Sequence, residues 1–115
     1  MFWGIECGDG WFRLLDNLLE HIQFHIDNNK YPQIVAEQIK EKFSGLRFYY
    51  SGGDDYIRGM ISFAEHLSYY ICETCGTMEN IGRTSGWMKT ICKDCFDKNP
   101  GNLKWTSKEA DEKEL

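Results

Sequence analysis

The sequence of 115 residues predicts an α+β protein in which two amphipathic helices pack on a short antiparallel sheet. Two stretches with apolar residues at every third or fourth position predict the helices. A run of alternating apolar and polar residues between them predicts the sheet. Two C-x₂-C motifs near the C-terminal end predict a small metal-binding module. We expect a helix–hairpin–helix core over residues 1–71, the cysteine module over 72–100, and a polar, mobile tail over 101–115.

The first helix is expected in the sequence DGWFRLLDNLLEHIQFHIDNN, over residues 9–29. Its apolar residues fall on one face of a helix: Trp11, Leu15, Leu18, Ile22 and Ile26. Asp9 is the expected N-cap, because an aspartate side chain can accept a hydrogen bond from the first free backbone N–H groups. Asn28 and Asn29 suit the C-terminal end, and Pro32 prevents the helix from continuing.

A hairpin is expected in the sequence QIVAEQIKEKFSGLRFYYSG, over residues 33–52. Leu46, Phe48 and Tyr50 alternate with Arg47 and Tyr49, as in a strand with one buried face. Ser44-Gly45 is the expected turn. Residues 34–43 alternate less regularly, so a helix is an alternative for that stretch.

The second helix is expected over residues 54–71, after the sequence SGGDD. Its apolar face contains Ile57, Met60, Ile61, Ala64, Leu67 and Ile71. Glycines before a helix also resemble a phosphate-binding loop. However, no Lys-Ser/Thr pair follows them, and Asp54 and Asp55 put carboxylates where an anion would have to lie. We therefore interpret this loop as a helix-starting turn in which Asp54 or Asp55 is the N-cap.

The clearest motif is the pair of C-x₂-C sequences formed by Cys72 and Cys75, and by Cys92 and Cys95. The 16 residues between the pairs fall in the range expected for zinc. Four thiolates complete a tetrahedral coordination sphere, so we expect one structural Zn²⁺ ion without an open position for a catalytic water. The module is then a Cys₄ zinc finger of zinc-ribbon or treble-clef type, and a short helix beginning near Cys92 would favour the treble clef. Redox disulfides are the alternative, but a thioredoxin-like site has a single C-x-x-C motif.

Charge and composition restrict the classes of function. The net charge of −5 becomes about −7 once four thiolates hold one Zn²⁺. An acidic chain disfavours general nucleic-acid binding, despite a local basic cluster of Arg83, Lys89, Lys93 and Lys98. No apolar run reaches the roughly 20 residues of a membrane span, and the N-terminus lacks a signal-peptide pattern. We expect a cytoplasmic protein with reduced cysteines. Four tryptophans exceed the needs of a small core, so some rings are expected on a binding surface.

Weaker patterns suggest other sites. The candidate ligand- or partner-binding residues lie around the hairpin and the second helix start: Arg47, Tyr49, Tyr50, Asp54, Asp55 and Arg58. Two guanidinium groups and an aromatic ring can hold a nucleotide-like ligand or the carboxylates of a partner, whereas a solvated Arg–Asp network is the alternative. His21 and His25 share a helix face but have no evident third metal ligand. Cys7 is expected to be a buried thiol rather than a nucleophile.

The sequence QIKEKFSGLRFYYSGGDDYIRGMISFAEHLSYYICETCG, followed by GWMKTICKDC, resembles a family of small uncharacterised bacteriophage and prophage proteins. These proteins share a KEKFGGLRFY-type strand, a helix with an AE-x-x-S stretch, and paired C-x₂-C motifs. The resemblance covers roughly residues 11–95, and Ser44 departs from the more usual glycine. It implies phage origin and action in the host cytoplasm, and it brings no established activity.

We expect a non-enzymatic interaction protein that binds and modulates a host protein, with counter-defence as one such role, or that binds a second copy of itself. One alternative is a protein that binds or sequesters a small nucleotide signal. Another is a nucleic-acid-binding zinc-finger regulator. No catalytic residues are expected, because no convergent acid, base and nucleophile are visible.

Overall fold

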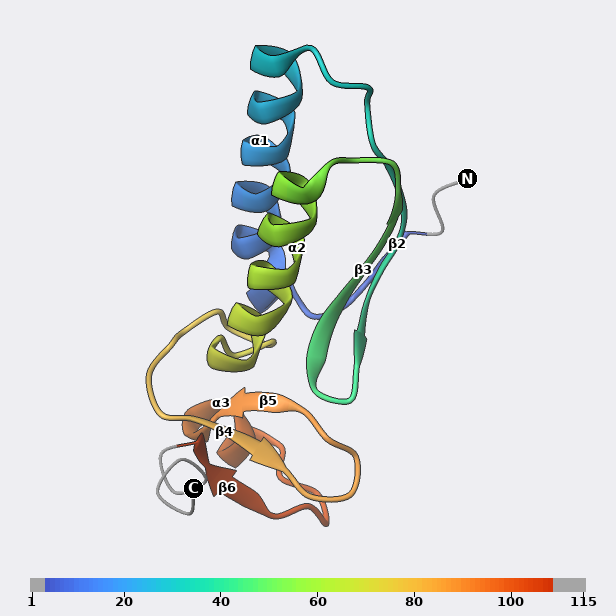
Figure 1. The fold of residues 1–115 in the computed structure, drawn as a ribbon. Coiled ribbons are helices and arrows are strands. Elements are labelled where there is room, and N and C mark those ends of the chain that lie inside the picture. Colours follow the sequence, from blue (N-terminus) through green and yellow to red (C-terminus); the bar gives the residue numbers. More distant parts are fainter. Residues whose placement is uncertain (1–3, 109–115) are drawn as a thin grey trace.

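The structure of the protein is a computed structural model that describes residues 4–108. It is elongated, with principal extents of 49 × 30 × 19 Å. Figure 1 shows two parts stacked along the long axis: a core of helices beside a sheet, and a smaller part that contains β4, β5, α3 and β6. The fold is therefore α+β, as predicted. None of the helices in the described range is long and apolar enough to cross a membrane.

Two helices form one layer of the core. A 3₁₀ turn (Asp9–Trp11) leads into α1 (Phe12–Asn29), and α2 (Asp55–Leu67) is followed by a second 3₁₀ turn (Ser68–Tyr70). Asp9 is not the N-cap, contrary to the prediction. The backbone N–H of Gly10 donates to Glu73, which holds this segment in a tight turn, so that α1 starts three residues after Asp9 with Trp11 as its N-cap.

The sheet of the core has the order β1-β2-β3. β1 (Ile5–Glu6) runs parallel to β2 (Val35–Lys42), and β2 pairs antiparallel with β3 (Gly45–Ser51). β2 confirms the strand rather than the helical alternative. The register shifts between Ala36 and Gln38, and this bulge explains the irregular alternation of the sequence. The short parallel strand β1 was not predicted.

The hairpin turn lies one residue earlier than predicted. Lys42 pairs with Gly45, so the two turn residues are Phe43 and Ser44. Their φ angles of 53° and 70° are both left-handed, as in a type I′ turn. Gly45 is instead the first residue of β3. A glycine is needed here because the ring of Tyr69 occupies the space that a side chain would take.

The hydrophobic core lies between the helices and the sheet. The predicted face of α1 is fully buried there, together with Ile39 and Leu46 from the sheet and Ile57 and Ile61 from α2. Trp11 is completely buried, and its indole N–H donates a 2.9 Å hydrogen bond to the carbonyl oxygen of Ile71. This bond ties the start of α1 to the chain that enters the cysteine module.

The cysteine module has its own antiparallel sheet, with the order β5-β4-β6. It contains β4 (Ile81–Thr84), β5 (Thr90–Cys92), α3 (Lys93–Lys98) and β6 (Trp105–Ser107). β6 falls in the stretch that was expected to be a tail, so the module extends beyond residue 100. Trp105 holds β6 in place: its ring covers Gly82 and its N–H donates to the carbonyl oxygen of Ile91 at 2.9 Å. The rest of the expected tail, residues 109–115, lies outside the described residues.

Candidate metal centre

The structure brings the four cysteines of the two motifs together. The sulfur atoms of Cys72, Cys75, Cys92 and Cys95 all lie within 4.8 Å of one another. The Cys75 and Cys92 sulfurs are 3.8 Å apart. A tetrahedron with metal–sulfur bonds of about 2.3 Å has sulfur–sulfur edges of about 3.8 Å. The cluster could therefore hold one metal ion, and four thiolates in this arrangement suit zinc.

The first pair of cysteines sits on a tight turn that follows α2 and its 3₁₀ turn. The N–H of Gly76 donates to the carbonyl oxygen of Cys72 at 2.9 Å, and the N–H of Cys75 points at the Cys72 sulfur at 3.5 Å. Gly76 has a φ of 86°, which a residue with a side chain rarely adopts. The turn aims both sulfurs at the same point.

The second pair spans the junction of β5 and α3. Cys92 ends β5 and caps α3, and its sulfur accepts a 3.4 Å hydrogen bond from the N–H of Cys95. α3 begins immediately after Cys92, so the order is turn, hairpin, helix. This is the arrangement that favours the treble-clef alternative over the zinc ribbon.

The charge state of the four thiols would be strongly affected by a bound cation. Burial alone would raise the pKa of the Cys72 thiol, but hydrogen bonds from the backbone N–H groups of Cys92, Cys75 and Thr74 lower this pKa to about 7. Burial and the neighbouring thiols raise the pKa of Cys95. Four sulfurs this close cannot all ionise without a positive charge between them, and a bound metal ion would replace their protons.

The N-terminal segment holds the first cysteine turn against the core. The Gly10 N–H donates to the backbone oxygen of Glu73 at 2.7 Å, and the Gly8 N–H donates to the Glu73 carboxylate at 2.8 Å. A side chain at residue 10 would collide with the backbone of Cys72, Glu73 and Gly76. Sequence reasoning missed this contact, although two glycines on either side of Asp9 are a signal of close backbone approach.

The tip of the β2–β3 hairpin forms the second junction with the cysteine module. The Thr90 hydroxyl donates a buried 2.7 Å hydrogen bond to the carbonyl oxygen of Ser44. The Glu73 N–H donates to the Thr90 carbonyl oxygen at 3.1 Å. β5, which carries Cys92, is therefore bonded both to the hairpin and to the first cysteine turn.

A groove opens at this junction, and we refer to it as the inter-module groove. It has a volume of about 430 Å³ between the hairpin tip and the loop that joins β4 to β5, and it is lined by Glu41, Lys42, Phe43, Gly86, Trp87 and Met88. Trp87 is 71% exposed and Phe43 is 65% exposed. The surplus of tryptophan in the composition was the sequence signal for such a surface, but nothing in the sequence places Phe43 beside Trp87.

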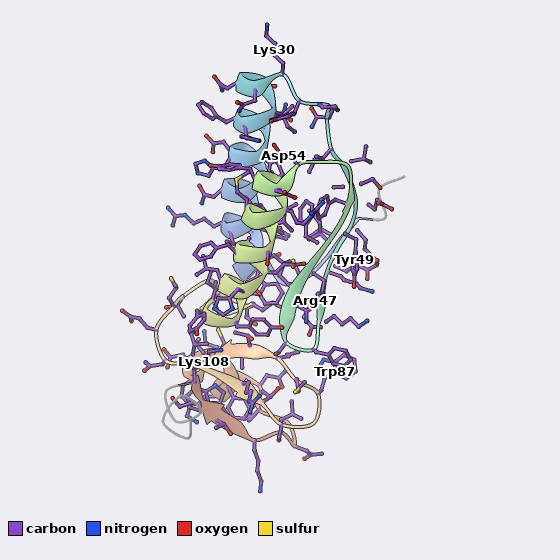
Figure 2. The ribbon with its side chains drawn as sticks, viewed as in Figure 1. Lys30, Arg47, Tyr49, Asp54, Trp87 and Lys108 are labelled. Carbon is purple, nitrogen blue, oxygen red and sulfur yellow. The ribbon has the colours of Figure 1, made fainter. Side chains whose placement is uncertain are left out.

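The predicted binding residues of the hairpin lie on β3. The Arg47 guanidinium donates to the Tyr69 hydroxyl at 3.1 Å, and Tyr49 is exposed with the Lys40 ammonium 5.6 Å from its ring centroid. Figure 2 shows Arg47 and Tyr49 on the hairpin, well away from Asp54. Tyr50 is half-buried and packs edge-on against Phe48.

The predicted residues at the start of α2 have structural partners. Asp54 is the N-cap, as predicted: its carboxylate accepts the Ile57 N–H at 2.9 Å and bonds the His25 ring at 2.9 Å. The His25 bond, with the Ile57 N–H, lowers the pKa of Asp54. Asp55 pairs with Arg58 at 2.9 Å, and both are exposed. Arg58 thus lies on α2 with Asp55, and the structure does not join it to Arg47 and Tyr49.

The remaining candidates also have local partners. His25 stacks between Tyr31 and Tyr56, with centroid distances of 5.4 and 4.3 Å. Burial, with Glu73 and Asp9 nearby, raises the pKa of Cys7 to about 11, which leaves its thiol protonated at neutral pH. In the predicted basic cluster, Lys93 pairs with Asp97 at 2.8 Å.

Comparison of the chain with protein-family models, with curated proteins and with solved structures gave no match. The resemblance to bacteriophage proteins therefore stays a prediction from sequence.

Proposed function

We propose that this chain is a non-enzymatic interaction protein, stabilised by one structural Zn²⁺ ion, that binds a partner protein through exposed aromatic side chains. The observation that carries the proposal is the position of the cysteine cluster. The cluster lies in the module whose β4–β5 loop presents Trp87, and the same module is bonded to the hairpin tip that presents Phe43. Tryptophan is enriched in binding hot spots, and Trp87 is exposed beside a second exposed aromatic residue in the same groove.

Zinc is the metal we propose, and its role is to hold the module folded. Thiolates are soft ligands that select zinc over the hard cations, and a complete set of four leaves no position for substrate or water. In small zinc modules the binding free energy of the metal, of order 10 kcal/mol, stabilises the fold. A six-residue helix and three short strands around the cluster form a very small core that needs this contribution.

The proposed partner is a protein of the host cytoplasm, in keeping with the resemblance to bacteriophage proteins, and modulation of host defence is one role that fits. Two other functions receive less support. A nucleotide site formed by Arg47, Tyr49 and Arg58 would require the three side chains to converge. Arg47 instead contacts Tyr69, and Arg58 pairs with Asp55 on α2. Nucleic-acid binding by the basic cluster would use Lys93, whose charge is paired with Asp97.

The proposal is tested on the purified full-length chain. Native mass spectrometry should find one zinc per chain, and Cys92→Ser should lose it. Affinity capture from a bacterial host lysate should then recover a protein with the wild type and with Phe24→Ala, but not with Trp87→Ala. Phe24 is the matched control because it is 67% exposed and lies on α1, outside the inter-module groove. A chain without stoichiometric metal, or capture that is indifferent to Trp87, would contradict the proposal.

A further inference from the structure

A second, smaller hollow continues the inter-module groove. It has a volume of about 190 Å³ and shares Phe43 and Met88 with the groove. Its other side is lined by Tyr69, Arg83 and Lys108. Figure 2 places Trp87 by the hairpin tip and Lys108 below the lower end of α2, at opposite ends of the junction between the two parts. The two hollows together make an extended site rather than a closed pocket.

The two ends of this site differ in chemistry. The end at Trp87 is apolar, with Phe43 and Met88 beside the indole. The end at Lys108 is cationic: the ammonium group lies 4.4 Å from the ring centroid of Tyr70 and 5.5 Å from that of Tyr69, and Arg83 lines the same hollow. Aromatic rings beneath an ammonium group fix its position without neutralising its charge.

The charge of the site is opposite to that of the chain. Among the described residues that line the two hollows, Lys42 and Lys108 carry ammonium groups and Glu41 carries a carboxylate, whereas the whole chain has a net charge of −5. The Glu41 carboxylate is also engaged, because it accepts the Ser44 N–H at 2.8 Å. A positive site on a negative molecule selects an anionic partner and repels copies of the chain itself.

The backbone at Phe43 gives an independent indication that this surface is functional. Phe43 occupies the first turn position with a φ of 53°, where Asn or Gly is usual and a bulky residue is strained. Its side chain contributes little to the core, since it is 65% exposed. A strained, exposed aromatic residue has a cost in stability that binding can explain.

We propose that the inter-module groove and its cationic extension bind an acidic peptide segment that carries one large apolar side chain. This inference rests on the proposed function and names the chemistry of the partner. The apolar side chain lies against Trp87, Phe43 and Met88, and a carboxylate a few residues away faces Lys108. The apolar anchor supplies affinity, and the charges supply selectivity and fast association.

The test is a selection of random displayed peptides on the zinc-loaded full-length protein, followed by affinity measurements with the enriched peptide. The enriched sequences should combine Trp, Phe or Leu with Asp or Glu a few residues away. Trp87→Ala should weaken binding by about tenfold or more, whereas Phe24→Ala should leave it unchanged. Lys108→Gln should weaken binding about threefold and reduce its dependence on salt. In an NMR titration the Trp87 indole N–H should shift, while those of the buried Trp11 and of Trp105 should stay fixed.

Several outcomes would overturn the inference. Enriched peptides without acidic residues, or with binding that is indifferent to Trp87→Ala, would show that the groove does not select this class. A dimer that Trp87→Ala dissociates would make a second copy the occupant, and tighter binding of a single-stranded oligonucleotide would make it nucleic acid. If no peptide is enriched while lysate capture still depends on Trp87, the proposed function stands and the acidic segment is rejected. If both fail, both proposals fall.

Discussion

At the scale of single residues, Ser68 shows how the core closes an exposed strand edge. Ser68 is completely buried, and its hydroxyl accepts the Leu46 N–H at 2.9 Å and donates to the Glu65 carbonyl oxygen at 2.6 Å. The Glu65 carboxylate accepts the next outward N–H of β3, that of Phe48, at 2.9 Å. Side chains of α2 and its 3₁₀ turn thus pair with the edge of β3, which blocks it from pairing with another chain.

Ser68→Ala should therefore destabilise the protein by about 1–3 kcal/mol, because it leaves the buried Leu46 N–H without an acceptor. The measurement is the free energy of unfolding in urea with zinc present. Ser62→Ala is the control: Ser62 is exposed on α2, and the change should alter the free energy of unfolding by about 0.5 kcal/mol or less. Equal effects of the two substitutions would show that the edge bond contributes nothing.

Asp54 is the residue whose charge should make stability depend on pH. Its pKa in the folded chain is lowered, first by the bond to His25 and then by the Ile57 N–H, so folding favours the ionised carboxylate. The contribution is present above the usual aspartate pKa and is lost as the pH falls through the lowered pKa of the folded state.

Asp54→Asn should isolate this charge, because asparagine can still cap α2. The wild type should be more stable than the variant above about pH 4, and the difference should shrink as the pH falls below that value. The measurement is the difference between their urea midpoints across pH, in which the acid sensitivity of the metal site, common to both proteins, cancels. A difference that does not change with pH would contradict the role of the His25–Asp54 contact.

At the scale of elements, a substitution in the turn of the β2–β3 hairpin should increase the stability of the protein. Phe43→Asn places at a left-handed position a residue that tolerates it, and it should stabilise the protein by about 1 kcal/mol. The same change removes an aromatic wall of the inter-module groove and should weaken the selected acidic peptide. Thermal unfolding and peptide affinity, measured on one preparation, test both effects. A variant of unchanged or lower stability would show that Phe43 is not strained.

The sequence predicted most of the elements because their signals are local. The periodic apolar residues identified both helices, and the side chains predicted for the face of α1 are all buried. The C-x₂-C spacing identified all four members of the sulfur cluster. The bulge at Glu37 interrupts the alternation of apolar and polar residues in this strand. For that reason the sequence pattern fitted both a helix and a strand over residues 34–43.

The errors came from contacts distant in sequence. The turn lies one residue before the predicted Ser44-Gly45, because the glycine at residue 45 makes room for Tyr69, which is 24 positions away in the chain. The Asp9 cap failed because Glu73 reshapes the start of α1. β6 was missed because a three-residue strand has no readable period, and its Trp105 packs on Gly82 across the module. The inter-module groove forms only where the hairpin tip meets the β4–β5 loop, so no local sequence pattern indicates it.

The junction of the two parts should be intolerant of any side chain at Gly10. A methyl group there would overlap with the backbone of the first cysteine turn, so Gly10→Ala should cost about 1–3 kcal/mol or more and weaken zinc retention. The control is Gly59→Ala, in α2, where a Cβ has open space around it and the change should stabilise the helix by about 0.5–1 kcal/mol. Urea unfolding and zinc content test the pair. A tolerated alanine at residue 10 would show that the two parts do not rely on this contact.

At the scale of the whole molecule, the metal should stabilise the module directly and the start of α1 through it. The core has its own hydrophobic cluster, whereas the module buries few large apolar side chains, such as Ile81 and Phe96, beside its cysteines. Zinc removal should therefore unfold the molecule from one end rather than uniformly. The contacts that pass this effect to the start of α1 are the Gly10–Glu73 and Trp11–Ile71 hydrogen bonds, and the Thr90–Ser44 bond reaches the hairpin tip.

Amide hydrogen exchange with and without a strong zinc chelator measures this directly. Chelation should accelerate exchange first at the amides of Gly8, Gly10 and Gly76, whose acceptors belong to the first cysteine turn. The amide of Phe48, which donates to the Glu65 carboxylate beside the hydrophobic core, should keep more of its protection. The control is readdition of zinc, which should restore the first group. Uniform loss of protection would make the metal a requirement for the whole fold, and no loss at all would remove it from the folding of this protein.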